Sequence, residues 1–394
     1  MSTKAAQVSD WSRRFTTASI GFLLVWSLGA VAGLSRRAEV SLGLFGFVFL
    51  AVFGRGYALL PTYFDRSLDP PWLPAAQFPL SAGGAVLLAV DGELGAPTLG
   101  TVGATLWLAG VVVFVGGLLW AVRTNLTGAE TATGEHNSHR RRIDRFANGF
   151  VPVVFAYLLV GSYELLAAAT GLPALLGGYP PRATHALAVG SATLLVFAVG
   201  FRLFPRFLRT TPAAPLEAVV LPLGAVSPAG LAVTLPAGGL FRVFAVAQAL
   251  AVLGYAAAIA AMFHRADGPR IGMYGVLAGA ALGVVGIGLG LWFAFRGLAP
   301  ELVDAHARVN LLGFLGLTIV GAAYQFYPPA VSRYPGGDDR TAAASIGAIA
   351  GGLLVQTAGA ARGVEPAVLA GQALAGLGVG LFAVVVLGAV RSRQ

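Results

Sequence analysis

The stretch HARVNLLGFLGLTIVGAAYQFYP, residues 306–328, joins a polar start to an apolar run long enough to cross a membrane. About 20 apolar residues span a hydrocarbon core roughly 30 Å thick. Its charged or titratable residues, His306 and Arg308, are costly to place in lipid. They therefore indicate either the end of a membrane span or specific polar partners within the protein. The pattern predicts a transmembrane helix over 303–328.

The same pattern occurs near the N-terminus, where EVSLGLFGFVFLAVFGRGYALLP (39–61) aligns with 306–328 without gaps. Five of the matching positions recur at intervals of three and four, which places them on one helix face. The similarity therefore has a packing rationale beyond shared apolar character. The matching residues are Leu44, Gly46, Phe47, Leu50, Gly54, Tyr57 and Pro61 in one stretch and Leu311, Gly313, Phe314, Leu317, Gly321, Tyr324 and Pro328 in the other.

A third stretch, HALAVGSATLLVFAVGFRLFP (185–205), keeps part of this pattern. Gly190 stands 15 residues before Pro205, and the first two stretches have a glycine at the same distance from their own proline. The three stretches fall in the second, sixth and tenth predicted spans. A three-fold repeat of a four-helix unit is the simplest account of that spacing.

Composition agrees with a membrane protein, because 57% of the 394 residues are hydrophobic and only 11% are charged. Soluble domains carry about a quarter charged residues. The 54 glycines fit close helix packing. The absence of cysteine excludes disulfides, iron–sulfur clusters and thiolate ligation of haem.

Apolar runs between charged or Pro/Gly-rich breaks predict twelve spans in a single transmembrane domain covering 1–394. The fold class is therefore an all-α membrane protein with about twelve helices in three quasi-equivalent four-helix units. Prolines such as Pro79 and Pro222 make the third and seventh spans the least certain in their bounds. The spans are 15–34, 39–61, 73–91, 100–122, 150–170, 183–205, 216–236, 240–263, 271–295, 303–328, 342–361 and 366–390.

The distribution of basic residues predicts the orientation. With the N-terminus inside, 17 of the 26 basic residues lie in inner segments and 5 in outer segments. The positive-inside rule then places both termini in the cytoplasm, with the chain in the plasma membrane and its first helix retained. The loop 123–149 is cytoplasmic, and its His136 and His139 are expected in a solvated basic segment rather than at a metal site. Bulk charge alone gives no support for nucleic-acid binding.

Glu39, His185 and His306 lie at the outer ends of repeat-related spans, and their side chains are expected at similar depth. The tenth span resembles the tenth helix of subunit I of the haem–copper oxidases, through its initial histidine, its Gly-Phe stretch and its aromatic-Pro end. The HALAVG segment (185–190) is similar to a segment of the NnrS family of haem- and copper-containing membrane proteins.

This resemblance implies a membrane protein that binds b-type haem, copper or both, and acts in electron transfer or in nitric-oxide or oxygen handling. If the protein is an enzyme, the resemblance implies an oxidoreductase with a redox partner or an accessory subunit. The oxidases carry H-x-H in the tenth helix, where this chain has His306 and Arg308, and a histidine in the second helix, where the nearest candidate is Glu39. The seventh span (216–236) has no histidine. A complete oxygen-reducing centre is therefore not expected.

His185 and His306 are the candidate metal ligands, and the alternative is a pair of interfacial histidines wetted by water. Arg308 is expected to hold a haem propionate or another anion, or else to pair with Glu39 or Glu164. A cofactor-free transporter, or an accessory or sensory membrane protein on the same scaffold, is the alternative function. Carriers usually show two related halves, whereas this repeat recurs every four helices.

Overall fold

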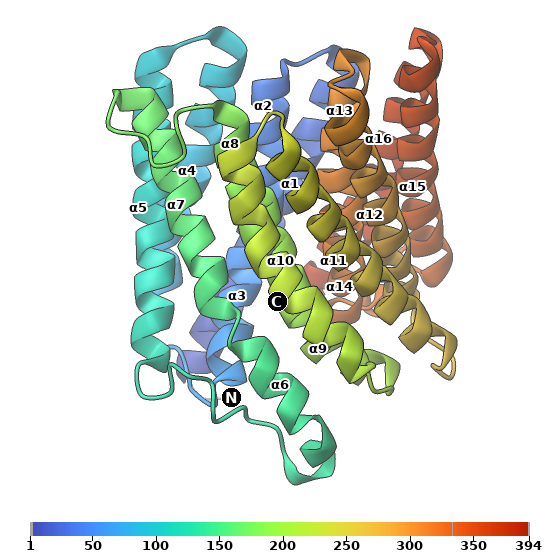
Figure 1. Ribbon diagram of the computed structural model, residues 1–394. Helices are drawn as coiled ribbons and strands as arrows, with labels where there is room; N and C mark the ends of the chain where they lie inside the picture. Colours follow the sequence, from blue (N-terminus) through green and yellow to red (C-terminus); the bar gives the residue numbers. More distant parts are fainter. Residues whose placement is uncertain (1–2, 333, 393–394) are drawn as a thin grey trace.

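The computed structural model describes residues 3–332 and 334–392. Within these ranges twelve helices are long and apolar enough to cross a membrane, as the sequence predicts. They stand side by side in one bundle (Figure 1). The protein is therefore a multi-pass, all-α membrane protein, and its natural surroundings are a lipid bilayer. In chain order the elements are α1 (Thr3–Ala32), α2 (Arg36–Val40), η1 (Ser41–Phe49), α3 (Leu50–Tyr63), α4 (Leu73–Leu94), α5 (Pro97–Val122), η2 (Glu135–Arg140), α6 (Arg141–Asn148), α7 (Val151–Thr170), α8 (Pro180–His185), η3 (Ala186–Thr193), α9 (Leu194–Leu208), α10 (Ala214–Thr234), α11 (Gly239–His264), α12 (Ile271–Arg296), α13 (Pro300–Arg308), η4 (Val309–Gly316), α14 (Leu317–Phe326), η5 (Pro329–Val331), α15 (Asp339–Arg362) and α16 (Glu365–Arg391).

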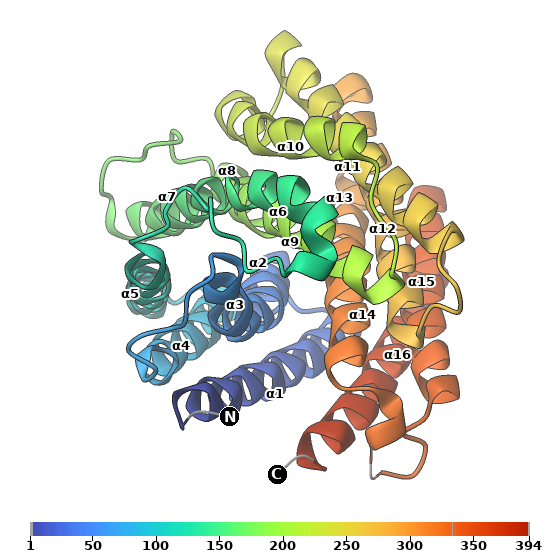
Figure 2. The ribbon, with the colours of Figure 1, turned by 90° about the horizontal axis from the view of Figure 1, so that it is seen from below.

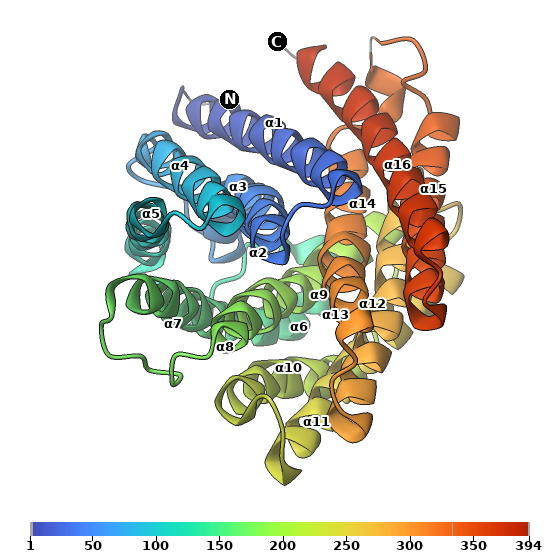
Figure 3. The same cartoon turned by 90° about the horizontal axis from the view of Figure 1, so that it is seen from above.

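The three repeat-related spans occupy the centre of the bundle. In the most apolar window of spans 36–63, 180–208 and 300–326, 72–78% of the residues are buried, against 33–56% in the other spans of the described chain. Seen from above, the other helices lie around these three (Figure 3). Every fourth helix is thus a central one, which agrees with the predicted three-fold repeat.

Each central span contains a π-helical segment, and the three segments share one register. They end at Phe49, Thr193 and Gly316, and each of these residues stands 12 positions before the repeat proline of its own stretch. The three segments, η1, η3 and η4, also pack against one another along the middle of the bundle. π-Helices are rare and occur frequently at functional sites. The sequence predicts the repeat, but it gives no sign of this shared departure from α-helical geometry.

The helix face predicted from the repeat points inward. Phe47, Leu50, Gly54, Tyr57 and Pro61 are all buried. Gly54 marks a close approach, because a Cβ atom there would lie 2.5 Å from the Cβ of Phe15 on α1. The repeated positions are therefore packing positions of the core.

One sequence expectation about helix bounds needs correction, whereas the third and seventh spans are confirmed within a few residues. The first helix begins at Thr3 instead of residue 15, and its polar first turns are held by an ion pair from Lys4 to Asp69 at 3.0 Å. Helices α4 and α10 run on through internal prolines, among them Pro79 and Pro222. Neighbouring helices in a membrane bundle satisfy the backbone groups that a proline frees, so these prolines do not end the spans.

Candidate metal site and buried ion pairs

His185 and His306 use their ring nitrogens in the same way. Nδ1 of His185 donates to the carbonyl oxygen of Pro181 at 2.7 Å, and Nδ1 of His306 donates to that of Gly286 at 3.1 Å. A carbonyl oxygen carries no proton, so these contacts favour the tautomer with the ring's hydrogen on Nδ1 and the lone pair on Nε2. Nδ1 of His306 also has a longer contact, 3.4 Å, to the amide nitrogen of Asn310. In the described part of the chain neither Nε2 atom has a hydrogen-bond partner. This arrangement is the one that orients histidines bound to metals.

The two histidines come from different central helices and lie near each other. His185 ends α8 directly before η3, and His306 lies in the last turn of α13, three residues before η4 begins. The two rings are close enough to interact electrostatically, and both are partly buried. The two candidate ligands thus lie on neighbouring central spans, whose π-helical segments pack against each other.

Helix α12 forms the wall behind His306. The ring of Phe293 meets the imidazole edge-to-face, with ring centroids 5.4 Å apart. Asn310 donates to the carbonyl oxygen of His306 at 2.8 Å. A Cβ atom at Gly286 would lie 2.5 Å from Oδ1 of Asn310. Glycine at position 286 therefore allows the Asn310 side chain to lie against α12, next to the carbonyl oxygen that contacts His306. The position of the imidazole therefore depends on a close contact between two helices.

Arg308 turns away from this wall and pairs with Glu39. Its Nε donates to Oε2 of Glu39 at 2.8 Å, and its Nη2 donates to Oε1. Trp26 donates from its indole to the same carboxylate at 3.2 Å, and Gln356 accepts from Nη1 of Arg308 at 3.5 Å. The side chains of Arg308 and Glu39 are only 13% and 9% exposed. Residues from four spans thus join in one buried polar cluster.

This cluster stands where the resemblance to the oxidases implies histidine ligands from the second and tenth helices. At those positions Glu39 and Arg308 neutralise each other's charge and form two parallel hydrogen bonds between guanidinium and carboxylate. Arg308 has no acceptor atom for a metal, and the Glu39 carboxylate already accepts three hydrogen bonds, two of them from Arg308. The residues present do not fit a haem ligated from these two positions.

Glu164, the other acid expected to pair with Arg308, has different partners. Its Oε1 accepts from the backbone N–H groups of Leu175 at 2.5 Å and Leu176 at 2.9 Å. The neighbouring Tyr163 hydroxyl donates to the carbonyl oxygen of Pro173 at 2.8 Å. Both residues therefore fasten the loop after α7. A carboxylate that accepts two backbone N–H bonds is already satisfied without an arginine.

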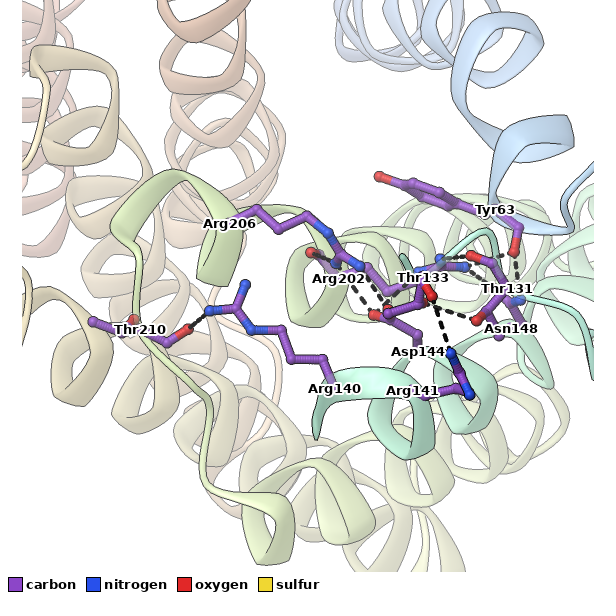
Figure 4. A network of polar contacts seen from close by, with 10 residues as sticks. All are labelled: Tyr63, Thr131, Thr133, Arg140, Arg141, Asp144, Asn148, Arg202, Arg206 and Thr210. Atoms are coloured by element: carbon purple, nitrogen blue, oxygen red, sulfur yellow. Dashed lines mark hydrogen bonds and ion pairs between the residues drawn. The ribbon is translucent and has the colours of Figure 1, made fainter. Parts of the chain in front are cut away.

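A second buried ionic network lies at the opposite end of the bundle, which we call the terminal end because Lys4 and Arg391 lie there. Asp144 on α6 accepts from both Arg206 nitrogens, at 3.2 and 2.6 Å. Thr133 donates to the same carboxylate, and Nε of Arg202 lies 3.4 Å from Oδ1. Figure 4 shows these side chains converging from α6, α9 and the segment before α6. Asp144 is 1% exposed.

Arg202 extends this network to the backbone. It donates to the carbonyl oxygens of Tyr63 and Thr131, each at 2.9 Å, and to the side chain of Asn148. Its guanidinium also lies over the Tyr63 ring, 4.1 Å from the centroid. The segment 123–149 is therefore tied to the ends of α3 and α9.

The expectation of a solvated loop over 123–149 is correct only in part. Asp144, Asn148 and Arg140 are buried, because their partners lie on other elements. His136 and His139 are exposed, as expected. Across residues 3–332 and 334–392 no group of three or more histidines and acids converges to hold a metal ion.

Several residues of these clusters escape sequence reasoning. Trp26, Asn310 and Asp144 lie in stretches where nothing distinguishes them from ordinary helix or loop residues. Arg202 does carry a signal in the sequence, because it lies three residues before the end of the predicted span 183–205. An arginine buried within a span needs a polar or charged partner. Comparisons with known proteins add no assignment: no family model and no curated protein matches the chain.

Proposed function

We propose that the protein is a plasma-membrane protein, with both termini in the cytoplasm, that binds a haem or copper through His185 and His306. The orientation is supported by the concentration of basic residues in the segments at the terminal end. The observation that carries the binding proposal is the shared geometry of the two histidines. Each is oriented through Nδ1 by a backbone carbonyl and keeps Nε2 for a ligand bond.

The number of ligands favours haem over a bare metal ion. Structural metal sites formed by protein alone usually need four ligands, and no such group is present among the described residues. In haem the porphyrin supplies four nitrogen ligands to the iron, so the protein needs to provide only one or two axial ligands. Two imidazoles from neighbouring central spans would meet that need. Copper held by the same two imidazoles is the alternative.

The protein's own residues have clear roles in this proposal. The carbonyl oxygens of Pro181 and Gly286 fix each imidazole in the tautomer that binds metal and increase the basicity of Nε2. Phe293 and Asn310 restrict the ring and the backbone of His306. Arg308 acts as the counter-charge of Glu39. A bound haem or copper would supply one-electron transfer or the binding of a small gas molecule.

An optical and metal analysis of the purified protein tests the proposal. We expect a Soret band that shifts on reduction, or copper bound in stoichiometric amount, after purification in detergent. His185→Ala and His306→Ala should each remove or shift the signal. His264→Ala is the matched control, because His264 also lies at a helix end but is exposed, and it should leave the signal unchanged.

The absence of both haem and copper from folded protein, also after incubation with haemin or copper, would overturn the proposal. A cofactor-free transporter or accessory protein on the same scaffold would then be the better account. The position of the ion pair at Glu39 and Arg308, where the resemblance implies ligands, favours that alternative. The central position of every fourth helix opposes a carrier built from two related halves.

A further inference from the structure

A groove opens at the terminal end, where α1 meets α4 and α16. Seen from below, α1 lies between these two helices (Figure 2). The groove has a volume of about 710 Å³. Its lining combines charged, aromatic and small residues: Asp10, Trp11, Arg13, Arg14, Thr17, Ala18, Phe78 and Val390. A groove on the periphery of a membrane protein faces lipid, so its occupant must suit the bilayer.

The charges of the groove are unequal. Arg13 forms an ion pair with Asp10, three residues earlier on the same helix. Arg14 is exposed, and its guanidinium lies over the Trp11 ring, 4.4 Å from the centroid. Among the residues that the structure describes, Arg14 has no carboxylate partner. One positive charge is therefore held in place at the mouth of the groove and remains available to an anion.

The floor of the groove is rigid and apolar. The ring of Phe78 packs edge-to-face on Phe15, with centroids 5.0 Å apart, and lies 5.8 Å from the Trp11 ring. Ala18 continues the apolar lining one turn further along α1, and Val390 adds to it from the last turn of α16. The groove thus changes from cationic to apolar along the direction that a lipid takes from headgroup to acyl chain.

We propose that this groove is a binding site for an anionic phospholipid. Arg14 takes the phosphate oxygens of the headgroup, and an acyl chain lies over Ala18 and Phe78. A guanidinium stacked on an aromatic ring is pre-organised for phosphate, which it can contact with two parallel N–H groups. Trp11 provides the amphipathic ring typical of the interface between membrane and water. Anionic headgroups attract basic residues at this depth. The proposal is independent of any cofactor.

Native mass spectrometry of the full chain with added phosphatidylglycerol or phosphatidylcholine tests this proposal. We expect a preference for phosphatidylglycerol that falls about fivefold in Arg14→Gln, the effect of one interfacial positive charge. The matched control is Arg123→Gln. Arg123 is exposed and lies over a tryptophan ring, Trp120, with its guanidinium 4.1 Å from the centroid, but it is not part of the groove. This control should keep the preference.

A second variant separates shape from charge. Thr17→Trp places a large side chain in the groove and leaves both arginines, so we expect it to weaken phosphatidylglycerol binding as well. Equal losses in Arg14→Gln and Arg123→Gln would overturn the proposal in favour of bulk charge. Equal binding of the two lipids would overturn it too. Displacement of the lipid by inorganic phosphate alone would show a free-anion site instead.

Discussion

The two ends of the bundle bury arginine and carboxylate in different ways. Glu39 and Arg308 form a one-to-one pair, and their other neighbours, Trp26 and Gln356, also lie on spanning helices. At the terminal end Asp144 serves two arginines, and Arg202 gives its remaining N–H groups to backbone carbonyls and Asn148. The first pair joins spans to one another, whereas the second network fastens a connecting segment to the bundle. The same chemistry should therefore stabilise the whole fold at one end and a local structure at the other.

The largest effect is expected for Arg308→Met. This change leaves the Glu39 carboxylate buried without its cation, and breaking a buried pair in this way typically costs about 3–5 kcal/mol. Thermal unfolding in detergent, followed by intrinsic fluorescence, should show a large fall in the midpoint of the whole protein.

The double variant Glu39→Met/Arg308→Met is the control for that experiment. Replacing both members of a buried pair by apolar residues is often neutral or stabilising, so most of the lost stability should return. A double variant no more stable than Arg308→Met would show that the pair is not the cause.

Asp144→Asn should have a smaller and local effect. Arg206 is 31% exposed and can be hydrated, and Arg202 keeps its bonds to two backbone carbonyls and to Asn148. We therefore expect a loss of about 1.5–3 kcal/mol, the range for hydrogen bonds to a charged group. Trypsin should cleave the segment 123–149 faster, while the unfolding midpoint of the bundle changes little. Asp267→Asn, an exposed acid in the loop between α11 and α12, should not change the cleavage rate. A fall in the unfolding midpoint of the whole protein in Asp144→Asn, as large as in Arg308→Met, would contradict the proposed difference between the two ends.

Two glycines on α12 test the wall behind His306. Gly286→Ala should destabilise by about 1–2 kcal/mol, because the new methyl group would overlap the Asn310 amide. Gly288→Ala meets nothing within 4 Å, and it should be neutral or stabilise the helix by up to about 1 kcal/mol. The unfolding midpoints of the two variants should therefore move in opposite directions or differ clearly. Equal midpoints would show that the helix contact at Gly286 is loose.

The smallest effect is expected at an exposed carboxylate of the terminal end. The backbone N–H of Thr341 donates to Asp338 at 2.8 Å and lowers the pKa of that carboxyl below its ordinary value of 3.8. A carboxyl with a lowered folded pKa stabilises the protein above the unfolded pKa, and this stability disappears as the pH falls below 3.8 through the folded pKa. Asp338→Ala should lower the unfolding midpoint slightly at pH 7 and by less as the pH falls below 3.8. A shift as large as that of Asp144→Asn would contradict the distinction between exposed and buried acids.

The sequence predicts the fold well and the site only in outline. The spans and the repeat follow from hydropathy and from the spacing of glycines and prolines, and the structure confirms both. The depth of His185 and His306 follows from the register, but their proximity also requires the right rotation of each helix. For Arg308 the sequence offers two acids, and packing selects Glu39 because Glu164 already caps a loop.

What the sequence alone determines is thus the number of spans, their order and the repeat of four helices, because the transfer of each segment into lipid depends on its own composition. What only the tertiary structure decides is the direction in which each polar side chain points. Rotation about a helix axis is fixed by contacts with distant helices, such as that of Gly286 with Asn310. The shared π-helical segments also depend on packing, since local propensity favours α-helix there. For this reason His306 and Arg308, two residues apart in the chain, have different partners.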